Sequence, residues 1–276
     1  MAELERVPPG VDPNVPSSAR VYDYLLGGKD HLAIDREIGG RLLAVAPDTR
    51  AVARANRMFL TRAVRHVAAR GVKQFLDLGT GIPTSPSVHE VARRVAPEAR
   101  VVYVDYDPVV QRHAEVLLAS EPGLTTLRAD LRRPAEILND PQVIELIDFE
   151  QPVGILMVAV LHFVMESESP AGIIKHFRDR MAPGSHLILS HTMAESAPES
   201  IRQLSLATAG SPAQSVFRTH EQVLQLFDGF KLIEPGLMPV QDWRVPGDDE
   251  PDIPLLDQAP RLRVEGGVGR LEHAHL

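Results

Sequence analysis

The sequence predicts an α/β fold with a mainly parallel sheet of about seven strands, an antiparallel last strand and a helical N-terminal extension. Three apolar runs, residues 75–78, 101–104 and 125–129, each carry an aspartate at or just after their end and lead toward a segment with a helical pattern. Two further apolar runs, 153–161 and 186–190, continue the series. Such alternation of buried strands with helices is typical of a parallel sheet that is covered on both faces.

The chain begins with a long segment before the first strand. We divide the sequence into an extension, residues 1–71, and a single structural unit, residues 72–276. Within the extension, residues 1–18 are rich in Pro and Ser and are expected to be irregular, and helices are expected at 19–26, 35–45 and 51–70. Because ligands bind at the carboxyl edge of such a sheet, we expect the extension to lie over that edge as a lid.

Capping and turn residues delimit the remaining elements. Ser87 and Glu90 fit a capping box at the start of one helix, and Thr219 and Gln222 fit a second one. Helices are also expected at 109–118, 141–148, 171–181, 196–207 and 221–227, strands at 230–233 and 261–270, and a solvated loop at 246–260.

The turn after the first strand carries the strongest functional signal. Gly79 and Gly81 permit a tight turn and let a ligand approach the backbone, and Thr80 lies between them. Asp77 would repel a pyrophosphate, but it could attract the ammonium and sulfonium groups of S-adenosylmethionine (SAM). The third glycine of the dinucleotide pattern is replaced by Thr84. The turn therefore favours SAM over NAD.

Acids at the ends of the next two strands complete a nucleoside site. Asp105 lies 24 residues beyond Gly81, close to the offset of about 20 residues expected of a ribose-binding acid, and Tyr106 follows it. Asp130 could accept from the adenine amino group while Leu131 packs on the ring. Taken singly, an aspartate after a strand is ordinarily a helix cap or a turn residue.

Four segments, residues 16–30, 53–57, 74–84 and 102–108, resemble the actinobacterial S-adenosyl methyltransferase family, long classed as a domain of unknown function. The resemblance covers nearly the whole chain, and its most specific part is Tyr-Asp-Tyr-Leu-Leu-Gly-Gly-Lys at residues 22–29. It implies a class I methyltransferase (Rossmann-like) fold and SAM binding, and it does not supply a substrate.

The extension also offers candidate cofactor contacts. Tyr22 and Gly28 could close over the cofactor, and the resemblance favours this role for Tyr22; alternatively, the tyrosine only anchors a short helix. Arg57 could pair with the SAM carboxylate through a bidentate contact. The alternative for Arg57 is a solvated helix face.

His162 is the candidate catalytic residue. It follows the fourth strand, near the expected position of the methyl acceptor, and it could act as a general base. Its alternative roles are orientation, helix capping or packing against Phe163. His191, after the fifth strand, is a weaker candidate of the same kind. His273 and His275 have no further ligands nearby in sequence, so we interpret them as part of a terminus and predict no metal site.

The composition of the chain excludes several classes of binding partner and site. With 29 basic and 37 acidic side chains, the net charge of −8 argues against broad binding to nucleic acids or anionic membranes. The chain has no cysteine, which excludes disulfides, thiolate metal ligands and cysteine nucleophiles. Its first residues do not resemble a signal peptide, and its longest apolar run, 153–161, is too short to span a bilayer. We therefore expect a cytoplasmic protein.

These features predict direct methyl transfer from SAM to an acceptor held in line, with positioning and exclusion of water supplying much of the rate. A small molecule of secondary metabolism is the favoured acceptor. The sequence does not decide whether oxygen, nitrogen or carbon is methylated, whether a base is used, or the oligomeric state. Two alternatives stay open, a SAM-binding module without catalysis and an NAD-dependent oxidoreductase.

Overall fold

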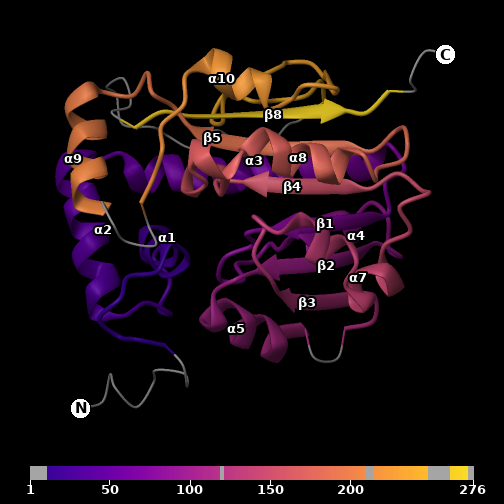
Figure 1. Ribbon diagram of the computed structural model, residues 1–276, viewed down its shortest axis with the longest axis horizontal. Helices are drawn as coiled ribbons and strands as arrows, with labels where there is room; N and C mark the ends of the chain where they lie inside the picture. The colour runs from indigo at the N-terminus through magenta and orange to yellow at the C-terminus, as the bar shows by residue number, and fades with distance from the viewer. Residues whose placement is uncertain (1–10, 119–120, 209–213, 248–261, 273–276) are drawn as a thin grey trace.

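The computed structural model describes residues 11–118, 121–208, 214–247 and 262–272. Its N-terminal extension forms three helices, α1 (Ser18–Leu26), α2 (Ala33–Val45) and α3 (Thr49–Ala69). Each begins within two residues of the predicted position. A buried ion pair from Arg20 Nε to Asp35 Oδ2, at 2.6 Å, fastens α1 to α2. In Figure 1, α1 and α2 lie at the end of the sheet toward which the arrows of β2, β3 and β4 point.

The sheet confirms the predicted topology. Strands β1 to β5 pair in parallel, and β8 runs antiparallel beside β5, giving the order β3-β2-β1-β4-β5-β8-β6, with the short β7 also paired to β8. The strand order reverses between β1 and β4, and ligands of doubly wound sheets bind at such a switch point. The strands are β1 (Gln74–Leu78), β2 (Arg100–Asp105), β3 (Leu124–Arg128), β4 (Gly154–Val158), β5 (His186–Thr192), β6 (Lys231–Leu232), β7 (Met238–Pro239) and β8 (Val264–Arg270).

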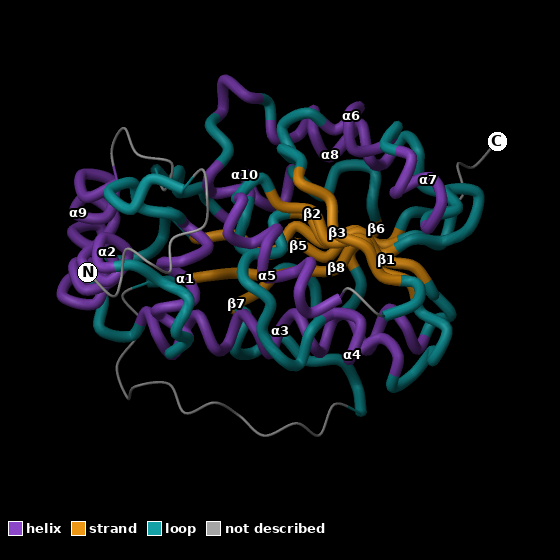
Figure 2. Tube along the Cα trace, turned by 90° about the horizontal axis from the view of Figure 1, so that it is seen from below, coloured by secondary structure: helices purple, strands orange, loops and turns teal. Residues whose placement is uncertain are grey.

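Helices cover both faces of this sheet. Figure 2 views the sheet along its edge, with α3 and α4 on one side and α6, α7, α8 and α10 on the other. These helices are α4 (Val88–Arg93), α5 (Pro108–Leu118), α6 (Pro134–Leu138), α7 (Pro141–Leu146), α8 (Pro170–Arg178), α9 (Pro198–Thr208) and α10 (His220–Gln225), and short 3-10 turns lie at Leu161–Phe163 and Glu166–Glu168.

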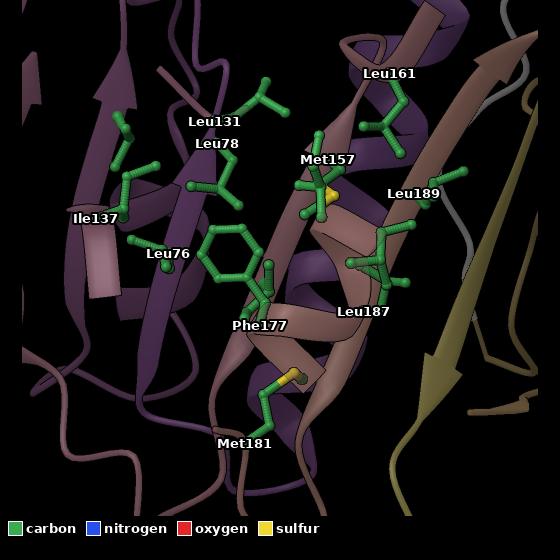
Figure 3. Close-up of a cluster of buried hydrophobic side chains, with 14 of the residues drawn as sticks. Leu76, Leu78, Leu131, Ile137, Met157, Leu161, Phe177, Met181, Leu187 and Leu189 are labelled. Atoms are coloured by element: carbon green, nitrogen blue, oxygen red, sulfur yellow. The ribbon is translucent and has the colours of Figure 1, made fainter. Parts of the chain in front are cut away.

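Alternation along the strands divides the core between the two faces. Leu76 and Leu78 of β1 belong to the cluster that also contains Phe177 of α8, whereas Phe75 packs with Val64 of α3 on the opposite face. Figure 3 shows the first cluster, in which strand side chains meet those of α6 and α8. Successive side chains of a strand point to opposite faces, so an uninterrupted apolar run is what a sheet covered on both sides requires.

Several expected elements differ from the structure. The fourth strand was expected over 153–161 but ends at Val158, because Ala159 has a φ of 54° and a 3-10 turn starts at Leu161. The predicted strand 230–233 is paired only at Lys231–Leu232, and α6 and β7 were not expected. The loop predicted at 246–260 lies almost wholly outside the described residues, and so do His273 and His275.

Candidate functional site

The turn after β1 is formed by two glycines with positive φ, 72° at Gly79 and 66° at Gly81. A Cβ on Gly79 would lie 2.3 Å from Val160 Cγ2, so this glycine is also required by close packing. A Cβ on Gly81 would meet nothing within 4 Å. The Thr80 hydroxyl donates to Asp77 Oδ2 at 2.9 Å, which fixes the carboxylate below the turn. The local backbone thus leaves open space beside Gly81.

Asp105 joins this turn to the end of β2. Its Oδ2 accepts from the Gly81 amide and its Oδ1 from the Asp107 amide, both at 2.9 Å. Burial raises the pKa of Asp105 to about 6, and burial likewise raises the pKa of Asp77 to about 6. Two desolvated carboxyls therefore lie near each other, and hydroxyl or ammonium donors from a ligand would favour their ionised forms.

Asp130 and Leu131 follow β3, as predicted, and both line the same cavity as Asp105. Arg132 donates to both oxygens of Asp130, through Nε at 2.9 and 3.0 Å and through Nη2 at 2.7 Å, and its Nη1 reaches Glu168 at 3.0 Å. Burial raises the pKa of Asp130, but the bonds from Arg132 outweigh it and leave the pKa below the usual value. The Asp130 side chain is 27% exposed.

Tyr22 and Tyr106 both line the cavity, from α1 and from the end of β2. The Tyr22 hydroxyl donates to the Ala53 carbonyl at 3.1 Å and accepts from Asn56 Nδ2 at 3.0 Å. Asn56 Oδ1 in turn accepts from Ser190 Oγ at 2.7 Å. The same Ser190 oxygen accepts from the Ala159 amide at 3.0 Å, in the loop after β4. Tyr22 is therefore part of a network that spans α1, α3, β5 and this loop.

Arg57 and Gly28 are placed differently. Arg57 lines the cavity, and its Nη2 donates to the carbonyls of Thr84 and Pro86, at 2.9 and 2.8 Å. It thus holds the segment that follows the glycine turn. Gly28 is absent from the described residues that line the cavity; a Cβ there would lie 1.9 Å from Asp23 Oδ1, so close packing explains this glycine.

His162 lies in the 3-10 turn after β4 and lines the cavity. Its Nδ1 is 3.4 Å from Thr192 Oγ1, and its ring packs against Phe163 with centroids 4.3 Å apart. Burial lowers its pKa well below the usual value, and the nearby His191 and Arg218 lower it further. His162 is therefore neutral near pH 7 and can accept a proton or a hydrogen bond.

His191 has a structural role that its hydrogen bonds define. Its Nδ1 lies 2.7 Å from the Thr192 carbonyl, which can only accept, and its Nε2 lies 2.8 Å from Arg218 Nη1, which can only donate. The ring is therefore neutral, in agreement with a pKa that burial lowers to about 4. It is not among the described residues that line the cavity.

Arg218 anchors the turn that carries His162, and sequence reasoning missed it. Its Nη1 donates to the Leu161 carbonyl and its Nη2 to the Val164 carbonyl, both at 2.9 Å. Its Nε donates to Glu166 Oε1 at 2.6 Å. No sequence signal singled out Arg218, because its partners lie 27 to 57 residues away in the chain.

Except for Gly28, the predicted cofactor-binding residues line one cavity of about 560 Å³, and His162 lines it too. It joins the ends of β1, β2 and β3 to the loop after β4 and to the inner sides of α1, α2 and α3. Within the described ranges, no group of three or more His, Asp or Glu side chains could hold a metal ion. The parallel strand order and the row of acids at three successive strand ends define a class I methyltransferase.

Comparisons with known proteins agree with this class. The model of the S-adenosyl methyltransferase family matches residues 5–272. A crystal structure of a proposed methyltransferase from Thermobifida fusca is 38% identical, has a TM-score of 0.88, and aligns over 97% of this chain and 99% of its own. A DUF574 family protein from Streptomyces avermitilis is 38% identical, with a TM-score of 0.85 and coverage of 94% and 98%. No curated protein matches the chain.

The chain therefore belongs to the S-adenosyl methyltransferase family, and the protein is a SAM-dependent methyltransferase. The alternative of an NAD-dependent oxidoreductase is wrong for a member of this family. None of the helices in the described ranges is both long and apolar enough to cross a membrane.

Proposed function

We propose that the protein transfers the methyl group of SAM to a small-molecule acceptor that occupies the part of the cavity beside His162. The observation that carries this proposal is the continuity of the cavity, which connects the strand-end acids to the space beneath α1, α2 and α3. Both a cofactor and an acceptor can then lie in one continuous cavity, as transfer in line requires.

The residues at the strand ends suit SAM. Asp105 lines the cavity and could accept from the ribose hydroxyls, and the open space beside Gly81 lets the ligand lie against the backbone. Leu131 and Tyr106 could hold the adenine ring between them, while Asp130 accepts from its amino group. Asp77 and Arg57 would face the charged amino-acid end, although Arg57 already holds two carbonyls.

When bound, SAM supplies an electrophilic methyl group on a positively charged sulfur. His162 orients the acceptor and takes its proton at Nε2, which has no hydrogen-bond partner in the described part of the chain. Loss of that proton to His162 would leave the acceptor's electron pair free to take the methyl group that bound SAM would supply. The hydrogen-bond network from Tyr22 to Ala159 holds the helical extension against the loop that carries His162. We propose that this extension acts as the lid.

Two experiments test this function. S-adenosylhomocysteine (SAH) should bind at one site in calorimetry, and Asp105→Ala should weaken it by about 2–4 kcal/mol because the ribose loses a charged acceptor. Asp140→Ala, which removes the cap of α7 outside the cavity, serves as the control and should leave the affinity unchanged. An unchanged affinity for Asp105→Ala in a folded protein would assign Asp105 a structural role.

The acceptor class is tested with SAM that carries a labelled methyl group. The enzyme is incubated separately with the metabolite, protein and nucleic-acid fractions of a cell extract, and label should enter the metabolite fraction. Transfer to protein or nucleic acid alone would contradict the proposed acceptor class. A cytoplasmic location and a part in secondary metabolism belong to the same proposal, and an acceptor from central metabolism would contradict the second.

A further inference from the structure

The cavity has two chemically distinct parts. Its charged lining residues come from the strand ends and from Arg57 of α3, together with Arg132 beside Asp130. Apart from Arg132, which is bonded to Asp130, these are the groups already assigned to the cofactor. The part contributed by α1, α2 and β8 and by the inner side of α3 is apolar, and its lining includes Val21, Leu25, Ile38, Leu42, Val52 and Val264.

The polar groups in the apolar part already have protein partners. Thr49 Oγ1 donates to the Ala46 carbonyl at 2.6 Å. The Tyr22 hydroxyl is hydrogen-bonded to the Ala53 carbonyl and to Asn56, and the Asn56 side-chain amide donates to Tyr22 and accepts from Ser190. A carboxylate, phosphate or ammonium group placed here would lose its hydration without gaining an opposite charge from the described lining.

Aromatic residues also line the cavity, from the turn after β4 and from the segment before α10. His162 presents a neutral ring there, and Phe163 and Phe217, both half-buried, line the same cavity. Aromatic side chains favour flat apolar ligands through stacked or edge contacts. One polar atom of such a ligand can reach His162, while the rest of the ligand remains among the apolar side chains.

We infer that the acceptor is an uncharged, largely apolar small molecule with an aromatic ring and one hydroxyl or amine nucleophile directed at His162. This inference rests on the proposed function and adds the chemical class of the substrate. The charge pattern of the cavity selects against anionic and cationic acceptors, because charge compensation is confined to the cofactor part.

A matched pair of fluorescent probes tests the inference. N-phenyl-1-naphthylamine is neutral, and 8-anilinonaphthalene-1-sulfonate has the same ring skeleton with an added sulfonate. Both are titrated into protein saturated with SAH, so that the cofactor part is filled. The neutral probe should bind at one site per chain and at least tenfold more tightly than the anion.

A pair of variants distinguishes probe binding in this cavity from non-specific hydrophobic binding elsewhere on the protein. Leu42→Lys places a cation in the apolar part and should reduce the preference for the neutral probe at least tenfold, with SAH binding retained as evidence of folding. Val116→Lys makes the same change at a residue of α5 that is 70% exposed, and it should leave the preference unaltered.

Equal or tighter binding of the anion to the unmodified protein, or no binding of the neutral probe, would overturn the inference, whatever the variants do. An equal loss of preference in both variants would also overturn it, because the site would then not be this cavity. Failure of SAH itself to bind would instead contradict the proposed function.

Discussion

Arg218 offers a sharp test of how the turn carrying His162 is held. Arg218→Met keeps an unbranched, though shorter, side chain and removes every donor of the guanidinium. The Val164 carbonyl and His191 Nε2 then lose their bonds from Arg218, of 2.9 and 2.8 Å. The Leu161 carbonyl keeps its 3.1 Å bond from the Val164 amide.

The size of the effect follows from these orphaned groups. Each buried acceptor left without a donor costs about 1–3 kcal/mol, so we expect the free energy of unfolding to fall by about 2–6 kcal/mol. Glu166 adds little, because its side chain is 67% exposed and is solvated once the arginine is gone. Urea denaturation followed by circular dichroism measures the change.

Two further readouts separate this role from generic destabilisation. Loss of the arginine's charge should raise the pKa of His191 from about 4, although burial, its main cause, continues to keep that pKa low. The histidine ring signals in NMR would show this. Methyl transfer should also decline more than SAH affinity, because the bonds hold the turn of His162 and not the strand-end acids.

Arg202→Met is the matched control, since Arg202 forms an exposed pair with Glu199 on α9 and its loss should leave the free energy of unfolding nearly unchanged. A cost for Arg218→Met as small as that of the control would refute the reasoning that these buried bonds anchor the turn.

Three other predictions use the glycine turn, a buried histidine and the strand-end acids. Gly81→Ala should lower the free energy of unfolding by about 1–2 kcal/mol, because alanine is strained in a left-handed backbone. Gly79→Ala adds the clash with Val160 and should lower it by about 2–5 kcal/mol, so equal losses in urea denaturation would contradict the packing argument. Burial lowers the pKa of His186 to about 4, so its neutral form contributes to the free energy of unfolding above pH 6.5, and this contribution is lost as the pH falls toward 4. The loss should amount to about 3 kcal/mol, and it should be missing in His186→Leu. The pKa of Asp105 is about 6 in the free protein, and its ionised form should bind ligand donors, so SAH affinity measured by calorimetry should weaken as the pH falls through 6. An affinity independent of pH from 7.5 to 5 would argue against that contact.

Local signals were sufficient for the framework of the site. Asp77, Gly79, Gly81 and Asp105 could be predicted because each occupies a position relative to a strand end that the chain itself specifies, and the structure brings them together around one cavity. The parallel direction of the first five strands followed from the alternation of strands and helices, since parallel strands need crossover connections.

The sequence was less informative where a residue's role depends on distant partners. Ser190 and Asn56 are 134 residues apart in the chain yet share a hydrogen bond, and nothing local distinguishes them from other buried polar residues. Gly28 was expected at the cofactor, but the structure packs it on Asp23. The prediction placed the end of the fourth strand three residues too late, because an apolar run cannot show where the backbone takes a positive φ.

The sequence by itself determined the α/β class, the glycine turn and the acids at the strand ends, because periodicity and chain-local geometry encode these features. Only the tertiary structure decided which histidine faces the cavity. His162 and His191 both follow buried strands, but Arg218 and the Thr192 carbonyl occupy both nitrogens of His191, whereas His162 retains one nitrogen without a partner in the described ranges. Hydrogen bonds between residues far apart in the chain depend on the packed arrangement of the elements, and no local pattern specifies that arrangement.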